Sequence, residues 1–112
     1  MAEKISYADF EKIEIRVGTI TAAEDFPEAR NPAYRLRIDF GEFGEKKSSA
    51  QITKLYREEE LVGKQVVAVV NFPPKQVANF ISECLVLGIV LDGQQVVLLQ
   101  PERKAPNGKR ML

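Results

Sequence analysis

The sequence predicts a small, mainly β protein in which five or six short strands form a closed or partly open barrel. Two observations support this fold class. Runs of β-branched and aromatic residues recur along the 112-residue chain, and turn signals rich in glycine or proline separate them. The helical patterns are short: one lies near the N-terminus and one before the strand expected to be central. The length suits one domain, which we expect to cover residues 1–112.

The N-terminal elements are predicted from a cap and an alternation. Ser6 and Asp9 resemble a capping box, which predicts a helix from Tyr7 to Lys12 that buries its aromatic residues. Apolar and charged residues then alternate over residues 13–21, as in a half-exposed strand. Gly18 interrupts this alternation and indicates a β-bulge or a close backbone approach.

The next strands follow a loop. Residues 24–32 contain two prolines and predict that loop. Tyr34 to Gly41 shows the clearest alternation in the chain, with aromatic and aliphatic residues on one face and charged residues on the other. Residues 41–47 contain two glycines and predict a turn. Lys47 to Ile52 follows as a weaker strand.

The strand expected to be central runs from Lys64 into an unbroken apolar segment, residues 66–70. An uninterrupted run of this kind predicts a strand that is covered on both faces. Leu55 to Val62 is a candidate short helix before it. Pro73 and Pro74 end the strand, because proline has no N–H group to continue a ladder.

The C-terminal part predicts a hairpin and a tail. Residues 76–82 are ambiguous and carry weak helical spacing. Cys84 to Leu91 is a second apolar run, and the Asp92-Gly93 turn leads to a returning strand over residues 96–99. Residues 101–112 resemble an irregular tail. The two apolar runs exceed what one small domain covers, which indicates a partner subunit.

Composition excludes several functions. The chain has no histidine and a single cysteine, so a serine or cysteine triad of the usual kind, an internal disulfide and a cysteine metal cluster are all ruled out. We expect no enzyme, no metal and no cofactor. Sixteen basic residues balance sixteen acidic ones, which argues against indiscriminate coating of nucleic acid or membranes. With no signal region and no membrane-length run, a cytoplasmic protein is expected.

A binding face is the remaining candidate site. Arg35 and Arg37 share one strand face, Lys46 and Lys47 follow one turn later, and Lys75 follows the central strand. These cations suit phosphate or carboxylate, and nearby aromatic residues offer stacking or apolar contact: Tyr34, Phe72 and Phe80. The alternative is a solvated face whose charges pair with acidic neighbours, namely Asp39, Glu42 and Glu45. Composition does not decide between the two.

An ordered set of short motifs resembles the tRNA-binding domain family, from Phe10 to about Gly88. No single motif is specific, but their order is. The family opens with Asp-hydrophobic-Arg-Val-Gly, which here is Glu14-Ile15-Arg16-Val17-Gly18. Its later motifs follow in the same order. Lys-Leu is here Arg35-Leu36, the Tyr is Tyr56, and Leu-hydrophobic-Gly is Leu61 with Gly63. Asn-Leu is Asn71-Phe72, Pro-Arg/Lys is Pro74-Lys75, and Ser-Glu-Gly-Met is Ser82-Glu83-Cys84-Leu85.

Within this family the chain resembles the export-related chaperones. The resemblance implies an OB-fold five-stranded barrel with a short helix before the central strand, N- and C-terminal extensions, and a homodimer formed through those extensions. It also implies a cytosolic role in holding unfolded preproteins for the secretion motor SecA, whereas other family members bind tRNA. The stretches that carry it are Ser48–Thr53, Val69–Pro74, Ser82-Glu83, Leu85–Gly88, Leu98–Pro101 and Pro106–Gly108.

Two departures from the broader family pattern affect the expected ligand. Ala50-Gln51 replaces Ser-Gly, and Cys84-Leu85 replaces Gly-Met. Glycine permits close approach of a base or backbone, which the larger residues here do not, so we expect the balance to favour peptide over tRNA. Arg16, beside Gly18, is expected to be structural. The peptide- or RNA-binding residues predicted are Arg35, Arg37, Lys47, Gln51, Asn71, Phe72, Lys75 and Ser82.

Overall fold

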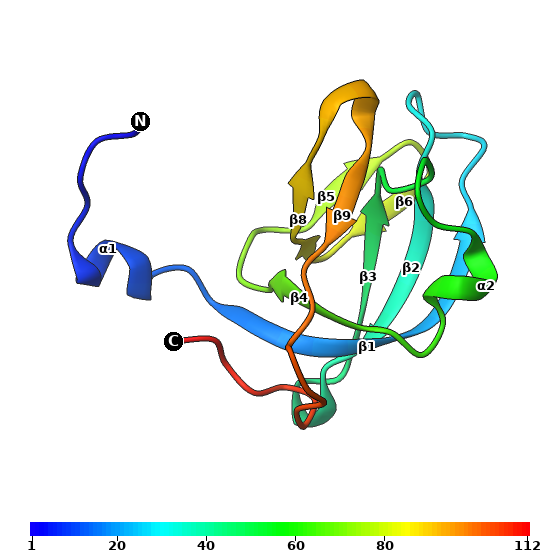
Figure 1. The fold of residues 1–112 in the computed structure, drawn as a ribbon. Coiled ribbons are helices and arrows are strands. Elements are labelled where there is room, and N and C mark those ends of the chain that lie inside the picture. Colours follow the sequence, from blue (N-terminus) through cyan, green and yellow to red (C-terminus); the bar gives the residue numbers. More distant parts are fainter.

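The computed structural model describes residues 1–112 and confirms a mainly β fold. One antiparallel sheet has the strand order β3-β2-β1-β4-β7 and curls into a nearly closed barrel (Figure 1). Its strands are β1 (Ile15–Asp25), β2 (Tyr34–Asp39), β3 (Glu45–Ala50), β4 (Gln65–Val69) and β7 (Leu85–Val86).

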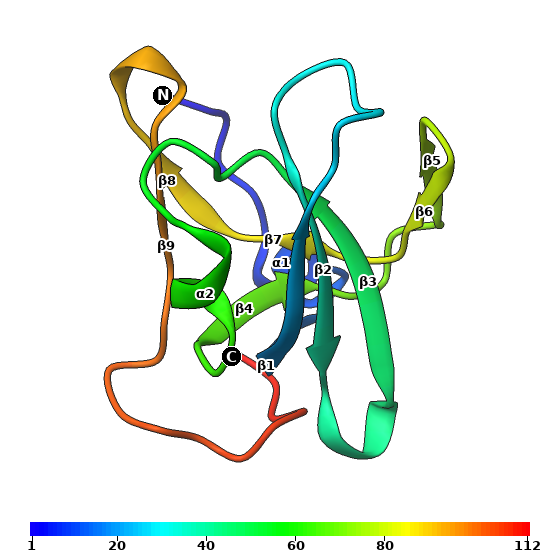
Figure 2. The same ribbon diagram turned by 90° about the vertical axis from the view of Figure 1, so that its right-hand side faces the viewer.

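Two hairpins and several short helices surround the barrel. Figure 2 shows the β5–β6 hairpin beside β3 and away from the β8–β9 hairpin. No helix has the length and apolar character needed to cross a membrane. The hairpin strands and short helices around the barrel are α1 (Tyr7–Glu11), the 3-10 turn η1 (Gly41–Phe43), α2 (Glu58–Leu61), β5 (Lys75–Val77), β6 (Phe80–Ser82), β8 (Gly88–Val90), the 3-10 turn η2 (Asp92–Gln94) and β9 (Val96–Leu98).

The alternation predicted for β2 is confirmed and supplies the centre of the core. Its inward residues are all buried, together with Ile20 on β1 and Val66 on β4. Gly18 allows the strands to approach closely, because a Cβ atom there would lie 2.6 Å from the Ile38 Cγ2 atom. The β-bulge itself lies three residues further on, between Ile20 and Ala22.

The strand expected to be central is β4, and two details of that expectation were wrong. β4 pairs with β1 and β7, but β1 is the middle strand of the sheet order. Val66, Ala68 and Val69 are buried, while Gln65 and Val67 are only partly buried. The apolar run therefore buries one face fully and leaves the other partly open.

Helix α1 forms as predicted but does not bury its aromatic residues. The Ser6 hydroxyl accepts the Asp9 N–H, and the Asp9 carboxylate accepts the Ser6 N–H, which completes the capping box. No residue of α1 is buried, and Tyr7 is 66% exposed. The helix stands away from the barrel on an arm (Figure 1), so it has no core of its own chain to pack against.

The ambiguous segment over residues 76–82 belongs to the β5–β6 hairpin and is not helical. The register pairs Val77 with Phe80 across the two-residue turn Ala78-Asn79. Ala78 has a φ of 51°, a value more typical of glycine at the first position of a tight hairpin turn. The sequence gives little hint of this turn, because alanine stands where glycine is usual.

The tail does not form a regular element, yet it is bound to the barrel. The Gly108 N–H donates to the Val17 carbonyl over 2.8 Å, the Val17 N–H donates to the Lys109 carbonyl over 3.0 Å, and the Met111 N–H donates to the Ile15 carbonyl over 2.8 Å. The tail therefore runs along β1 of its own chain.

Candidate functional site

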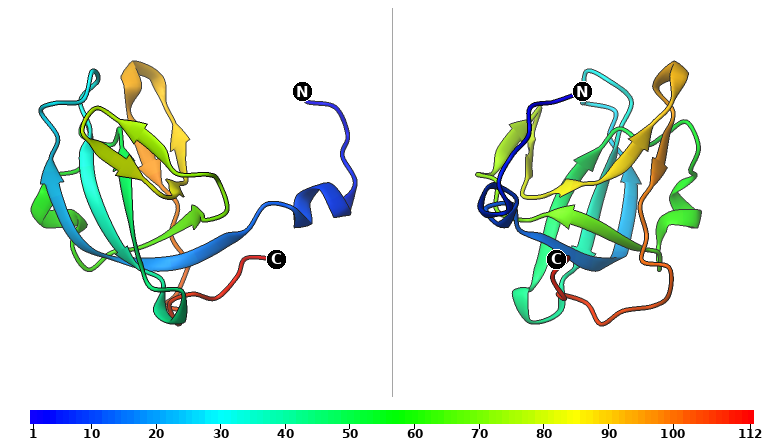
Figure 3. Two further views of the ribbon diagram at one scale, coloured as in Figure 1. Left: turned by 180° about the vertical axis from the view of Figure 1, so that it is seen from behind. Right: turned by 60° about the vertical axis from the view of Figure 1, so that its left-hand side comes forward.

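A cavity lies between the β5–β6 hairpin and the outer face of the barrel. It has a volume of about 690 Å³. Seen from behind, the yellow-green hairpin lies over β3, which it contacts through β6 (Figure 3). The lining comes from the end of β3, the β4–β5 connection, the hairpin and the approach to β7: Ser49, Gln51, Phe72, Pro73, Lys75, Gln76, Val77, Ser82, Glu83, Cys84 and Leu85.

Side chains hold the cavity wall against β3. The Glu83 N–H donates to the Lys47 carbonyl over 2.8 Å, and the Glu83 carboxylate accepts the Lys47 N–H over 2.9 Å. The Ser82 hydroxyl accepts the Ser49 N–H over 3.1 Å. These bonds satisfy the edge of β3 where no regular strand continues the sheet, so the wall is fixed to the barrel.

The lining combines apolar and polar groups. Phe72 is 53% exposed and Leu85 is 48% exposed, so both present apolar surface that no group of this chain covers. Lys75 supplies a cation, and Gln51 supplies an amide. Such a cavity suits a ligand that combines an apolar side chain with amide or carboxylate groups.

Cys84 lies in the cavity wall, and it is buried with the barrel core. Burial raises the pKa of the Cys84 thiol to about 11, although its contact with Ser48 opposes the shift. The Ser48 hydroxyl donates to the Cys84 carbonyl over 2.9 Å. Cys84 is buried, and its thiol is a poor nucleophile at neutral pH because the thiolate form is rare.

The outer face of β2 and β3 lies next to the cavity. Arg35 faces Ser49 and Arg37 faces Lys47 in the strand register, so all four side chains share this face. The Arg35 Nε atom lies 3.4 Å from Glu24, and the Arg37 Nη1 atom lies 3.4 Å from Glu45. Both arginines are thus partly neutralised.

None of the three remaining candidate cations, Lys46, Lys47 and Lys75, takes part in an ion pair. Lys46 lies opposite Ile38 and thus on the other face of β3 from Lys47. The acidic-partner alternative therefore holds for Arg37 with Glu45. Asp39 instead accepts the Gly41 N–H over 2.8 Å. The free positive charge on this side of the molecule is carried by lysine.

Aromatic residues reinforce this face. The Lys47 Nζ atom lies 5.2 Å from the centre of the Phe80 ring, and the Phe80 and Phe26 ring centres lie 5.5 Å apart. The Arg35 guanidinium lies 5.3 Å from the Phe26 ring centre. Tyr34, by contrast, is buried and donates its hydroxyl to the Tyr56 carbonyl, so it does not offer a stacking surface.

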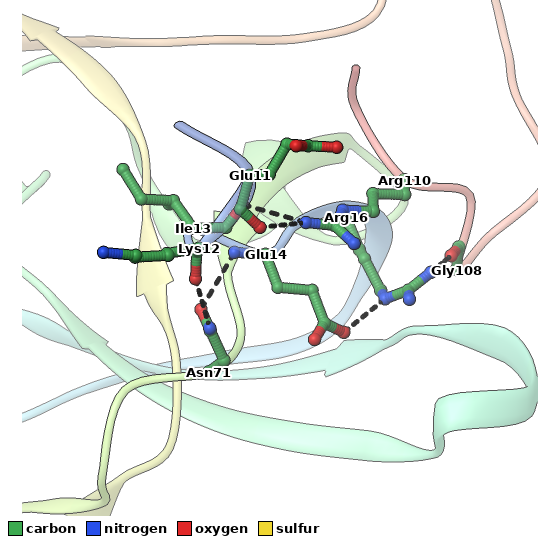
Figure 4. A network of polar contacts seen from close by, with 8 residues as sticks. All are labelled: Glu11, Lys12, Ile13, Glu14, Arg16, Asn71, Gly108 and Arg110. Atoms are coloured by element: carbon green, nitrogen blue, oxygen red, sulfur yellow. Dashed lines mark hydrogen bonds and ion pairs between the residues drawn. The ribbon is translucent and has the colours of Figure 1, made fainter. Parts of the chain in front are cut away.

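Asn71 lies outside the cavity and fastens the N-terminal arm. Its side-chain amide donates to the Lys12 carbonyl over 2.8 Å, and its oxygen accepts the Glu14 N–H over 2.9 Å (Figure 4). Arg16, expected to be structural, lies in the same network, where it donates to the Gly108 carbonyl over 2.7 Å and pairs with Glu14. The Asn71 side chain thus satisfies distant backbone groups.

The eight predicted site residues therefore fall into three groups. Gln51, Phe72, Lys75 and Ser82 meet in the cavity. Arg35, Arg37 and Lys47 lie on the adjoining sheet face, while Asn71 lies elsewhere. The prediction missed the residues whose role depends on the hairpin and on the segment before β7: Ser49, Pro73, Gln76, Val77, Glu83, Cys84 and Leu85.

Comparisons with known proteins agree with this architecture. The family model described as "Putative tRNA binding domain" matches residues 15–110. The crystal structure of chaperone CsaA from Bacillus anthracis is 57% identical, covers 98% of this chain and 100% of that chain, and has a TM-score of 0.94. The CsaA chaperone protein from Picrophilus torridus is 55% identical over 97% of this chain and 100% of that chain, with a TM-score of 0.90.

A longer relative is also similar. The methionine–tRNA ligase of Porphyromonas gingivalis is 38% identical over 97% of this chain, which spans only 16% of the ligase. The barrel thus has the OB-fold of its structural neighbours. The chain belongs to the tRNA-binding domain family, and over its full length it is similar to the CsaA chaperones.

Proposed function

We propose that this protein is a non-catalytic chaperone of the CsaA type, which binds unfolded preproteins as a homodimer and assists their secretion. The observation that carries the proposal is the cavity of about 690 Å³ with its mixed apolar and polar lining. In this proposal the protein acts in the cytoplasm and passes preproteins to the secretion motor SecA.

The chemistry of the cavity favours an unfolded polypeptide. Phe72 and Leu85 offer exposed apolar surface to a side chain that a folded protein would bury. Gln51 offers a side-chain amide to the peptide backbone, and Lys75 offers a charge to carboxylates.

Uncovered apolar residues support the homodimer. On the arm, Ile5 and Tyr7 are each 66% exposed, and at the other terminus Leu112 is 94% exposed. A smaller cavity of about 220 Å³ lies between α1 and the tail. Val90 on the β8–β9 hairpin is 77% exposed. A second copy that covers these terminal segments would remove their apolar surface from water.

The second candidate function is tRNA binding, favoured by the relationship to methionine–tRNA ligase and by the basic, aromatic face. Lys47 over Phe80 and Arg35 over Phe26 offer charge and ring surface to an RNA loop. Cys84 places a side chain where the wider family has a glycine, whereas Leu85 is similar in size to the methionine that it replaces. We therefore give peptide binding precedence.

The test is a pair of titrations at one fixed salt concentration. A fluorescent unfolded preprotein segment and bulk tRNA are each titrated with the protein, first alone and then in competition with each other. We expect peptide to bind more tightly, and tRNA to compete because both ligands use the cavity and the adjoining face. Tight tRNA binding with no detectable peptide binding would refute the chaperone proposal, and binding of both without competition would refute the shared site.

A further inference from the structure

Strand β5 has one free edge. It pairs with β6 on one side through the register Lys75–Ser82, Gln76–Ile81 and Val77–Phe80. Outside that hairpin the backbone of Lys75, Gln76 and Val77 makes no hydrogen bond. The other side of the hairpin is closed, since β6 lies against β3 and the Ser82 hydroxyl accepts the Ser49 N–H. A free strand edge is a template for another strand.

The hairpin geometry identifies the groups on this edge. In a two-residue hairpin, the residues that flank the turn exchange hydrogen bonds, and the next pair does not. Val77 and Phe80 flank the turn, so the Gln76–Ile81 pair is the non-bonded one. The Gln76 N–H and carbonyl therefore point outward, away from β6.

The side chains along β5 connect this edge to the cavity. Lys75 and Val77 share one face of the strand, and both line the cavity together with Ser82. A strand added beside β5 would follow the same alternation. Its residue opposite Gln76 would point to solvent, while the residues on either side of that one would point into the cavity.

We propose that unfolded polypeptide binds as an added β-strand along the free edge of β5, pairing its backbone with Gln76 and placing alternate side chains in the cavity. This inference rests on the proposed function. Recognition through the backbone explains how one site accepts many sequences, because every peptide residue except proline carries the same donor and acceptor.

The charges beside the β5 edge indicate which peptide sequences suit it. Lys75 lies on the cavity face of β5 and has no ion-pair partner. The Glu83 carboxylate already accepts the Lys47 N–H. The edge therefore suits an extended segment in which an apolar residue near Val77 and Leu85 is separated by one residue from a carboxylate that reaches Lys75.

The protein-side test compares Gln76→Pro with Gln76→Ala. Both changes remove the side-chain bond from the Gln76 amide to the Ala78 carbonyl, but only proline also removes the outward N–H. Proline is tolerated where an edge-strand N–H faces solvent, so the hairpin should persist. We expect Gln76→Pro to weaken peptide binding at least about tenfold, while Gln76→Ala changes it by less than about threefold. Equal affinities of the two variants would overturn the proposal.

The peptide-side test stays informative even if Gln76→Pro disturbs the hairpin. The probe is a fluorescent Gly-Ser peptide with one leucine and one glutamate separated by a single serine. N-methylation of that serine removes the N–H that would pair with Gln76, whereas N-methylation of the leucine or glutamate alters an N–H that faces away. We expect at least about tenfold weaker binding in the first case and less than about threefold in the other two.

The outcomes separate the two claims. If the unmodified peptide and an unfolded preprotein segment both fail to bind, the proposed function falls and the added strand falls with it. If they bind but all three N-methylated peptides bind equally well, the chaperone proposal stands and the added strand is refuted. A matched loss on methylating any of the three positions would also refute it, because the edge pairing requires alternation.

Discussion

At the scale of a single residue, the Cys84 thiol allows burial at the cavity wall to be measured. Cys84 is one of the residues in the cavity wall, and burial raises the pKa of its thiol to about 11 from the ordinary value of 9.0. The folded state therefore favours the neutral thiol. Any stability gained in this way is present below pH 9 and is lost as the pH rises through 11.

The first prediction concerns labelling of this thiol. At pH 8 a thiol reagent should modify Cys84 at least about tenfold more slowly than it modifies free cysteine, because the thiolate is rare. The rate should rise toward pH 11, and saturating peptide should slow it further at each pH by covering the cavity. Labelling in urea provides the exposed reference. A rate at pH 8 equal to that reference would contradict the burial of the thiol.

The second prediction compares two candidate cations, Lys75 and Arg35, which differ in whether they have an ion-pair partner. If tRNA binds, log K should fall with log salt by roughly 0.7 to 0.9 per phosphate contact. Lys75→Ala should reduce that slope by about one unit, because Lys75 has no ion-pair partner to satisfy. Arg35→Ala should reduce it less, because Glu24 already pairs with Arg35. A slope unchanged in Lys75→Ala would exclude a phosphate contact there.

The β5–β6 hairpin is the element on which the site depends. Its turn places alanine at a φ of 51°. Residues other than glycine pay roughly 1–2 kcal/mol in this conformation. The strained turn is adjacent to Val77, which lines the cavity, and it connects β5 to β6.

The third prediction tests that turn. Ala78→Gly should raise the free energy of unfolding by up to about 1 kcal/mol, since relief of strain exceeds the added freedom of the unfolded chain. Urea unfolding measures it. Gln94→Gly is the matched control, because Gln94 has a φ of 64° in the turn of the other hairpin. Both variants should keep peptide affinity; destabilisation of Ala78→Gly would contradict strain at this turn.

The sequence predicted elements best where one periodicity acted alone. The alternation over Tyr34 to Gly41 identified the start of β2 and its buried face, although the strand ends at Asp39. The β8–β9 hairpin followed from Asp92-Gly93. The β5–β6 hairpin was missed because its turn lacks glycine and its strands have only three residues each, too few for an alternation to stand out. Local signals fail where tertiary contacts to β3 determine the structure.

The reliance on local signals also explains which site residues the sequence identified. Gln51, Phe72, Lys75 and Ser82 were identified through family motifs, and the fold brings them together. Asn71 belongs to the same motif as Phe72, but both residues follow the end of β4 at Val69, where no regular strand fixes the direction of their side chains. The Asn71 amide reaches the arm while Phe72 reaches the cavity. Sequence adjacency could not distinguish these two roles.

For the whole molecule, the terminal segments have two roles. The tail is bonded to β1 through Gly108, Lys109 and Met111, so it stabilises its own barrel. The arm buries nothing in its own chain. The tail therefore stabilises its own barrel, and the exposed residues of both terminal segments, among them Tyr7 and Leu112, remain available for the proposed association.

The fourth prediction separates those roles. Deletion of residues 106–112 should lower the free energy of unfolding by about 2–4 kcal/mol, because three backbone hydrogen bonds and the packing around them are lost. Ile5→Ser should leave the free energy of unfolding of the isolated subunit unchanged and should weaken the dimer. Light scattering at micromolar concentration measures association, and urea unfolding measures stability. A monomeric wild-type protein would refute the homodimer.

The central claim is that unfolded polypeptide binds between the β5–β6 hairpin and the barrel. The most direct measurement is amide chemical-shift mapping of the labelled protein during titration with an unfolded preprotein segment. The account predicts that the largest shifts lie at Gln51, Phe72, Gln76, Val77 and Leu85, which line the cavity. Shifts confined to the arm and tail around Tyr7 and Leu112, with the cavity amides unmoved, would contradict it.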